Sequence, residues 1–307
     1  MSAGLGGALQ GWAYGLGWRM VRLLPEAVAA ETFQLGADLA AWRAGPGTRQ
    51  LRRNLARVVP QADEAELDEL VRRSLRSYAR YWREAFRLPS MDHDAVYREV
   101  SATMTGVEYI DAALEEGNGA VLALPHSGNW DVAGVFLVGH SGEFTTVAER
   151  LRPESLYRRF VAYRESLGFE VIPHNGPDAS PGTLLVRRLR ANRLVCLMAD
   201  RDLTPSGIPV TFFDAETRMP PGPAWLAAAT GAALLPAHTW FTADGWGLRI
   251  HPPIRVDGRD EVPAAMQGLA DVFAANIAAH PADWHMLQKL WLDDLSEARR
   301  ARLEQRQ

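Results

Sequence analysis

From Gly117 onward, short apolar segments of the chain alternate with longer segments in which apolar and polar positions recur at helical spacing. Short apolar runs bounded by turn residues are typical of buried strands, and longer periodic segments of helices. Strands are predicted at 119–124, 144–147, 169–172, 194–199, 233–238 and 246–251. Helices are predicted at 130–139, 155–167, 182–191, 223–230 and 263–280. This alternation predicts an α/β fold, one domain over 1–307 with a mixed, partly parallel sheet flanked by helices.

The first part of the chain lacks this alternation and is predicted to be helical over 8–43, 48–58 and 63–88. In the first of these segments, aromatic residues lie close to arginines, as in Trp18-Arg19. Rings and guanidinium groups together suit a membrane interface, although a helix packed on the domain explains them equally well. We expect the region of about 1–90 to associate with the membrane.

The segment 63–88 carries arginines spaced by three or four, which helical geometry lines up along a face. A solvated face offset by Glu64, Glu66 and Glu69 is the favoured interpretation, and contact with anionic lipid the alternative. Electrostatic attachment of this kind would weaken with added salt.

Composition excludes several classes of protein. The formal net charge of -4 argues against nucleic-acid binding, which usually needs a basic surplus. No apolar run approaches the ~20 residues that a bilayer-spanning helix needs, and no secretory signal is recognisable. The single cysteine, Cys196, lies in an apolar segment, so it is predicted to be a core residue and not a nucleophile. No metal site or resident cofactor is predicted, and a cytoplasmic location fits this cysteine usage.

The string His126-Ser127-Gly128-Asn129-Trp130-Asp131 follows the predicted strand at 119–124 and is the strongest indication of chemistry. If Asp131 accepts a hydrogen bond from Nδ1–H of His126, Nε2 is left as the acceptor for a proton from a substrate hydroxyl. The substrate would then be the nucleophile. Ser127 or Asn129 can cap the following helix, whose backbone N–H groups would lie near the reacting atoms.

Two other polar groups follow predicted strands. Asp200-Arg201-Asp202 comes after 194–199 and can orient the histidine, bind a sugar hydroxyl or form structural ion pairs, of which spacing alone favours the last. The two aspartates also fit a metal-assisted sugar transferase, but no nucleotide-binding fingerprint accompanies them. After 144–147 come Glu149 and Arg150, and Arg164 stands out among the later arginines as a group for a phosphate-bearing donor.

Taken in order along the chain, these blocks resemble a known family. The order is His126-x4-Asp131, Glu149-Arg150, Tyr163-Arg164-x3-Gly168, Asp200-Arg201-Asp202, Phe212-Phe213 and the Thr230-Gly231-Ala232 segment. It is similar to the lysophospholipid acyltransferase superfamily, in the branch of the bacterial lipid A acyltransferases, and within it to the actinobacterial phosphatidylinositol mannoside acyltransferases. Supporting segments are 77–86, 146–151 and 281–286, so that the resemblance covers nearly the whole chain.

The resemblance implies a glycerol-3-phosphate acyltransferase-like fold and transfer of a long acyl group, typically palmitoyl, from acyl-CoA to a mannose hydroxyl at the cytoplasmic face of the membrane. By position, His126 is implied as the base and Asp131 as its orienting partner, with Asp200 as a second carboxylate. The predicted substrate-binding residues are Arg164, Glu149, Arg201 and Asp202, which rest on the resemblance or on their spacing along the chain. The resemblance implies a glutamate at position 200, where this chain has the shorter aspartate.

Alternatives to this function remain open at the level of sequence. The same chemistry serves another glycolipid or a lysophospholipid as acceptor, and a non-catalytic peripheral lipid-binding protein would keep the histidine and carboxylates as structural groups. An acyl group needs an apolar groove, for which the candidates are Trp130, Val135, Phe136, Leu137, Phe212 and Phe213, although an ordinary core explains most of them.

Overall fold

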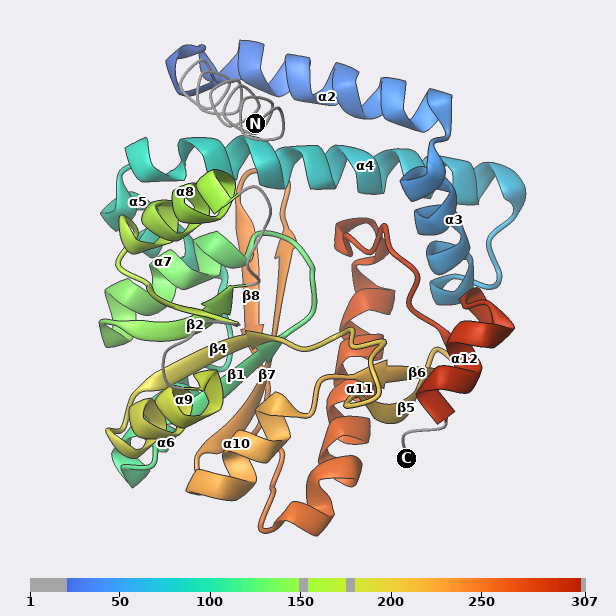
Figure 1. The fold of residues 1–307 in the computed structure, drawn as a ribbon. Helices are drawn as coiled ribbons and strands as arrows, with labels where there is room; N and C mark the ends of the chain where they lie inside the picture. The colour runs from blue at the N-terminus through green and yellow to red at the C-terminus, as the bar shows by residue number, and fades with distance from the viewer. Residues whose placement is uncertain (1–20, 149–153, 175–179, 305–307) are drawn as a thin grey trace, which may run out of the picture.

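A six-stranded sheet forms the centre of the molecule, which we describe from a computed structural model covering residues 21–148, 154–174 and 180–304 (Figure 1). The strand order is β3-β2-β4-β1-β7-β8, and every neighbouring pair is parallel except β7 and β8. The predicted mixed, partly parallel sheet is therefore confirmed, with each strand within three residues of its predicted bounds. The strands are β1 (Ala120–Leu124), β2 (Phe144–Ala148), β3 (Glu170–Pro173), β4 (Leu194–Met198), β7 (Ala233–Phe241) and β8 (Trp246–Ile250).

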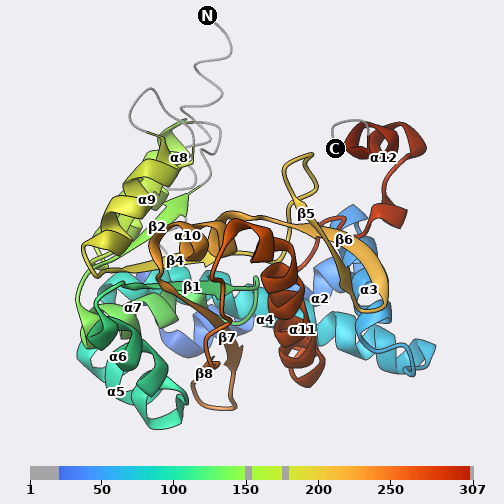
Figure 2. The ribbon, with the colours of Figure 1, turned by 90° about the horizontal axis from the view of Figure 1, so that it is seen from below.

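Helices cover both faces of the sheet. Successive side chains of its central strand, β1, point to opposite sides, so apolar residues face helices on each side. In β1, Val121 and Ala123 belong to one apolar core, and Leu122 and Leu124 belong to the other. Figure 2 shows α5, α6 and α7 on one face and α9 and α10 on the other. The helices of this part are α5 (His93–Thr103), α6 (Val107–Glu116), α7 (Trp130–Ser141), α8 (Glu154–Glu165), α9 (Pro181–Arg190), α10 (Gly222–Thr230) and α11 (Val262–Ala279).

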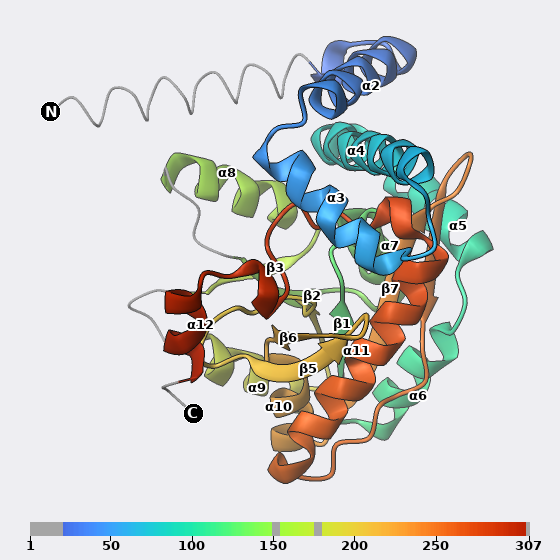
Figure 3. The same cartoon turned by 90° about the vertical axis from the view of Figure 1, so that its right-hand side faces the viewer.

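Three N-terminal helices, α2 (Glu26–Arg43), α3 (Pro46–Val58) and α4 (Glu64–Arg87), pack beside this core. Helix α4 begins with a capping box, in which Asp63 accepts from the Glu66 backbone and Glu66 accepts from the Asp63 backbone. Helix α2 lies along α4 (Figures 1 and 3). The predicted helix at 8–43 is confirmed only from residue 21 and is interrupted around Leu24-Pro25; residues 1–20 lie outside the described ranges.

The arginines of α4 mostly pair with acidic side chains of the protein itself. Arg76 binds Asp38 of α2 at 2.6 Å, and Arg87 binds Glu26 of α2 at 2.9 Å. Of the three glutamates expected to offset them, Glu69 does pair with Arg72, whereas Glu64 pairs with Arg52 of α3 and Glu66 belongs to the helix cap. Arg76 and Arg87 therefore hold α2 against α4. The residue pattern of α4 alone did not predict this contact between helices.

Several elements were not predicted from the sequence. The hairpin of β5 (Ile208–Phe212) and β6 (Ala215–Met219) packs on α11, and its turn residues Phe213 and Asp214 both have positive φ. Asn-Gly or Asp-Gly is the usual sequence signal for such a turn, so the Phe213-Asp214 pair did not indicate a hairpin. Also missed were α5, α6 and the C-terminal α12 (Glu297–Glu304), which are short. Among the described residues, no helix is long and apolar enough to cross a bilayer.

Candidate active site

Strand register brings His126 and Asp200 together. Strands β1 and β4 are parallel neighbours, and Leu124 of β1 stands opposite Met198 of β4. His126 and Asp200 each come two residues after that pair, so both lie at the carboxyl edge of the sheet, where α/β proteins usually form their sites. The bond from the Ala199 amide to the Leu124 carbonyl, 2.8 Å, continues the pairing past the strand ends.

The Asp200 carboxylate holds the His126 imidazole from behind. Its Oδ1 lies 2.6 Å from Nδ1 of His126, and its Oδ2 accepts the backbone N–H of His126 at 3.0 Å. The Trp284 indole N–H also donates to Oδ2, at 3.2 Å. The Asp200 side chain is fully buried, while that of His126 is 40% exposed. Because a carboxylate can only accept, Nδ1 carries the proton and Nε2 is left as an acceptor.

The charges of this pair stabilise each other. Burial lowers the pKa of His126, but the negative charge and hydrogen bond of Asp200 outweigh burial, so that the pKa is raised above its ordinary value of 6.5. For Asp200, burial raises the pKa, yet the charge and hydrogen bonds of His126 and the Trp284 donor leave it below its ordinary value. The carboxylate is therefore ionised when the imidazole takes up a proton.

The prediction that Asp131 orients His126 is wrong. Asp131 lies in the first turn of α7, buried, where its Oδ1 accepts from Nε of Arg164 at 3.0 Å and its Oδ2 from the Tyr81 hydroxyl at 3.2 Å. The carboxylate that holds Nδ1 follows β4, because sheet register and not closeness in sequence decides which groups meet at the strand ends. Asp131 therefore anchors the predicted substrate-binding arginine.

Arg164 extends from the last turn of α8 and is largely buried, with 20% of its side chain exposed. Burial lowers its pKa, and the charge of Asp131 more than offsets that, so the pKa is raised. A fixed cation thus lies on α8, next to the helix that begins with Trp130. Its positive charge opposes protonation of the imidazole and so acts to lower the pKa of His126.

The loop that carries His126 is clamped by the segment around Trp284. The Gly128 N–H donates to the Asp283 carbonyl at 2.9 Å, and the His285 N–H donates to the His126 carbonyl at 2.8 Å. Gly128 has a φ of +53°, and a Cβ there would lie 2.6 Å from the Thr239 carbonyl carbon, so only glycine fits. The N–H groups of His126, Ser127 and Gly128 are all engaged within the protein, so the predicted oxyanion donors are not found at these three positions.

The predicted helix cap is Asn129, whose Oδ1 accepts the Val132 N–H at 3.1 Å. Ser127, the other candidate, is buried in the loop and does not serve as the cap. The Cys196 thiol is buried, and burial raises its pKa, in keeping with the prediction of a core residue.

The remaining predicted residues are placed as follows. Arg201 directs its Nε to the Lys289 carbonyl at 2.8 Å, and its charge opposes protonation of His126. Asp202 accepts the Thr204 N–H in a loop, at 3.1 Å, and its own N–H donates to the Arg218 carbonyl. Glu149, with Arg150, lies outside the described residues.

Most of the candidate groove residues are core. Val135, Phe136, Leu137 and Phe212 are each at most 4% exposed, and Phe213 packs on Phe212 and Trp284. Trp130 is half-buried and stands edge-on to the His126 ring, with 5.7 Å between ring centroids. Trp130 is thus the one candidate of this set that adjoins the imidazole.

Two residues that contact this site were not assigned a role from the sequence. Trp284 and Glu84 both lie in segments that carried the resemblance, 281–286 and 77–86. Their contacts run to Asp200 and Asn129, which are distant in sequence, so only their place in these segments distinguished them.

Comparison with known proteins matches the sequence of this chain to a described family. The profile of the family described as "Bacterial lipid A biosynthesis acyltransferase" matches residues 5–293. The chain belongs to this family of acyltransferases. A protein named "Phosphatidylinositol mannoside acyltransferase" from Mycolicibacterium smegmatis is 58% identical over 299 residues, 97% of each chain. One of the same name from Mycobacterium tuberculosis (strain CDC 1551 / Oshkosh) is 57% identical over 295 residues, 96% of this chain and 92% of its own.

Membership in this family identifies the chain as an acyltransferase. A buried carboxylate next to a half-exposed imidazole is an arrangement that can take a proton from a hydroxyl.

Proposed function

We propose that this acyltransferase moves a long acyl group, palmitoyl for preference, from acyl-CoA to a mannose hydroxyl of a phosphatidylinositol mannoside at the cytoplasmic face of the cell membrane. The observation that carries the proposal is the 2.6 Å contact between buried Asp200 and Nδ1 of half-exposed His126. The names of the two relatives, at 57–58% identity over nearly the whole chain, support the acceptor.

In this mechanism, Nε2 of His126 removes the proton from the mannose hydroxyl as its oxygen attacks the thioester carbonyl carbon. The C–O bond forms, the carbonyl π electrons move to oxygen, and the imidazolium is stabilised by Asp200. Collapse of the tetrahedral intermediate breaks the C–S bond, and the imidazolium returns the proton to the departing thiolate. The products are the ester and free CoA, and His126 is again neutral.

Arg164 is proposed to bind the charged part of a substrate, since its guanidinium is fixed on one edge by Asp131. Phosphates of acyl-CoA or of the phosphatidylinositol headgroup are the anions that these substrates offer. Arg201, Asp202 and Glu149 complete the proposed substrate-binding set. Arg201 and Asp202 come directly after Asp200, on the loop that follows β4.

The acceptor is tested by following CoA thiol release and lipid products with one acyl-CoA donor and several acceptors. We expect rapid release with phosphatidylinositol mannosides and an ester on mannose in the product. Equal turnover with a lysophospholipid or a mannose-free glycolipid would move the proposal to a different acceptor. Binding to liposomes with no turnover of any acyl thioester would favour the non-catalytic, lipid-binding function.

Replacing Trp284 by phenylalanine is expected to shift the pH dependence of the reaction. Without the indole N–H, Asp200 is more basic and holds the proton on His126 more strongly, so that the pKa of His126 rises further. Neutral His126 is the base, and the acid limb of kcat/KM should therefore move up by about half a unit to one unit, because only part of the ~1.5–3 kcal/mol of a hydrogen bond to a charged group depends on whether His126 is protonated. The measurement is a pH profile of kcat/KM.

Trp291→Phe is the matched control. Trp291 is equally buried and donates its indole N–H to the Phe212 carbonyl at 2.8 Å, away from the carboxylate. We expect its acid limb to coincide with that of the wild type. Identical profiles for Trp284→Phe and wild type would mean that Trp284 only fills space.

Membrane attachment is proposed to run through the outer face of α2. Val28, Leu35, Leu39 and Trp42 lie at spacings of seven, four and three, so they share a face, and 44–80% of each is exposed. Most arginines of α4 pair with acidic side chains of α2 and α4, which favours apolar contact with lipid over the electrostatic attachment expected from the sequence.

The double variant Leu35→Gln with Trp42→Gln is therefore expected to weaken co-sedimentation with anionic liposomes by at least about tenfold, because at ~25 cal/mol per Å² the loss of only ~55 Å² of buried apolar area is enough for that change. The control is Arg73→Gln, which removes an exposed charge from α4 and should sediment like the wild type. Binding by the wild type should persist in high salt. Complete release by salt would contradict an apolar attachment.

A further inference from the structure

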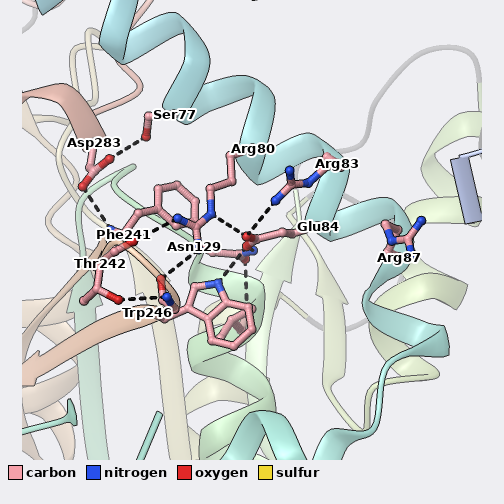
Figure 4. A network of polar contacts seen from close by, with 12 residues as sticks. Ser77, Arg80, Arg83, Glu84, Arg87, Asn129, Phe241, Thr242, Trp246 and Asp283 are labelled. Carbon is pink, nitrogen blue, oxygen red and sulfur yellow. Dashed lines mark hydrogen bonds and ion pairs between the residues drawn. The ribbon is translucent and has the colours of Figure 1, made fainter. Parts of the chain in front are cut away.

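A buried carboxylate of α4, Glu84, contacts the start of the helix that follows His126. Its Oε2 accepts from Nδ2 of Asn129 at 2.7 Å and from the Trp246 indole N–H at 2.8 Å (Figure 4). Its Oε1 accepts from Nε of Arg80 at 2.7 Å. The side chain of Glu84 is 7% exposed. One carboxylate thus joins α4, β8 and the N-terminus of α7.

The negative charge of Glu84 is matched by two arginines. Besides Arg80, the guanidinium of Arg83 lies 3.7 Å from Oε1. Arg80 is itself fixed, since it donates to the carbonyls of Thr242 and Gly245 at 3.1 and 2.9 Å (Figure 4). A buried charge is costly to keep, and an apolar residue of the same size would fill the space at less cost. The role of Glu84 is therefore to be sought in the groups to which it is hydrogen-bonded.

Asn129 links that carboxylate to the active-site loop. Its Oδ1 caps α7 by accepting the Val132 N–H, while its Nδ2 donates to Glu84, so both ends of the amide are fixed. Asn129 is 2% exposed and lies three residues after His126. An amide held at both ends sets the direction in which the chain leaves the loop and enters α7.

Helix α4 also supports the other side of this loop. The Ser77 hydroxyl donates to Oδ1 of Asp283 at 2.6 Å, and the Phe241 N–H donates to Oδ2 at 3.0 Å (Figure 4). The Asp283 carbonyl in turn receives the Gly128 N–H. The loop 126–131 is therefore held at Gly128 by the segment after α11 and at Asn129 by Glu84.

We propose that Glu84 is a positioning residue for acyl transfer: by holding Asn129, it fixes the start of α7 and keeps the His126 loop in the geometry that aligns the imidazole with Asp200. The role assigned to the loop rests on the proposed function. Glu84 touches neither substrate nor the imidazole, and its effect passes entirely through Asn129.

Glu84→Gln is the first variant. Glutamine removes the charge and offers one acceptor oxygen to donors on two sides, so its NH₂ group opposes either Arg80 or Asn129 and Trp246. In either orientation Asn129 loses its hydrogen bond to a charged acceptor, and the contact is weakened without a large change in volume. We expect kcat to fall by about 10–100-fold with KM for acyl-CoA within about threefold, since small misplacement of a reacting group acts on the chemical step. In the absence of substrate, hydrogen exchange of the peptide spanning Val132 should accelerate by about tenfold.

Two further variants separate positioning from general stability. Trp246→Phe removes the other hydrogen bond to the same carboxylate oxygen and leaves Asn129 in place, so kcat and the exchange of the loop should stay near wild type. In the reciprocal pair Glu84→Gln with Asn129→Asp, the amide and the carboxylate exchange places, the contact between positions 84 and 129 can re-form, and the new carboxylate still caps α7. This double variant should recover at least half of the loss in kcat on a logarithmic scale.

Equal losses in Trp246→Phe and Glu84→Gln, no recovery in the double variant, or unchanged exchange at Val132 would each overturn the proposal. Because exchange is read without substrate, it decides whether Glu84 holds the loop even if the acceptor or donor proposed above is wrong. Failure of acyl transfer by the wild-type chain would instead refute the proposed function and leave the exchange result standing.

Discussion

His126→Ala is expected to reduce acyl transfer by about 10²–10⁴-fold, the range that general-base catalysis usually contributes. The hydroxyl of the acceptor is a weak nucleophile until its proton is taken, and the Nε2 edge of His126 is the group placed to take it. KM for the donor should change little, because the imidazole acts on the acceptor proton. The measurement is initial rate of CoA thiol release with a saturating mannosylated acceptor.

His140→Ala is the control for this variant. His140 lies near the end of α7, and its Nε2 is 2.7 Å from Asp111, so it is also a histidine beside a carboxylate. It lies at the end of α7 away from His126, and its loss should leave the rate within about twofold, as expected for a substitution outside the site. A wild-type rate for His126→Ala would exclude this histidine as the base.

Asp200→Asn is expected to cost nearly as much, about 10²–10⁴-fold in kcat. Two donors, the His126 N–H and the Trp284 indole, meet Oδ2, so the asparagine oxygen must take that place. Its NH₂ group then faces Nδ1 of His126 and donates to it, which moves the ring proton to Nε2 and blocks the base. The variant is nearly isosteric, and melting temperature should show that the fold persists.

The pH profile gives this variant a distinct signature. The charge of Asp200 raises the pKa of His126 against burial, which lowers it. Removal of that charge lets burial dominate, so the pKa of His126 falls and the acid limb of the residual activity moves to lower pH. This direction is opposite to the one expected for Trp284→Phe. An acid limb unchanged in both variants would argue against coupling between this carboxylate and the base.

Asp131→Asn separates the two carboxylates of the site. It leaves the His126–Asp200 contact intact and weakens the anchor of Arg164, so the acid limb should stay in place while substrate affinity falls. Loss of the acid limb in this variant, and not in Asp200→Asn, would restore Asp131 as the partner of the histidine.

The sequence predicted the pieces of this site better than their pairing. All six strands of the main sheet were readable as short apolar runs, and both His126 and Asp200 were placed at strand ends. Their contact depends on β4 lying next to β1, although β4 begins 70 positions after β1 ends. Strand order follows from how helices pack on the whole sheet, so local pattern favoured the nearer carboxylate, Asp131.

The roles of Glu84 and Trp284 could not be predicted from local sequence, because they also depend on contacts between distant segments. In the sequence, Glu84 is a polar position of an arginine-rich helix and Trp284 an aromatic residue near a turn. Glu84 contacts Asn129, 45 positions away, and Trp284 contacts Asp200, 84 positions away. The aspartate at position 200, shorter than the glutamate that the resemblance implied, nevertheless reaches the imidazole at 2.6 Å.

The pairing of Leu124 with Met198 has a consequence for how this chain can vary. Side chains alternate between the two faces of a strand, so adding or deleting one residue in β1 or β4 would turn whatever follows it to the other face. Substitutions of similar size inside these strands alter packing, but a change in length would part the imidazole from its carboxylate. Sequences that diverge from this one while keeping the chemistry should therefore gather their insertions in loops and keep both strands at constant length.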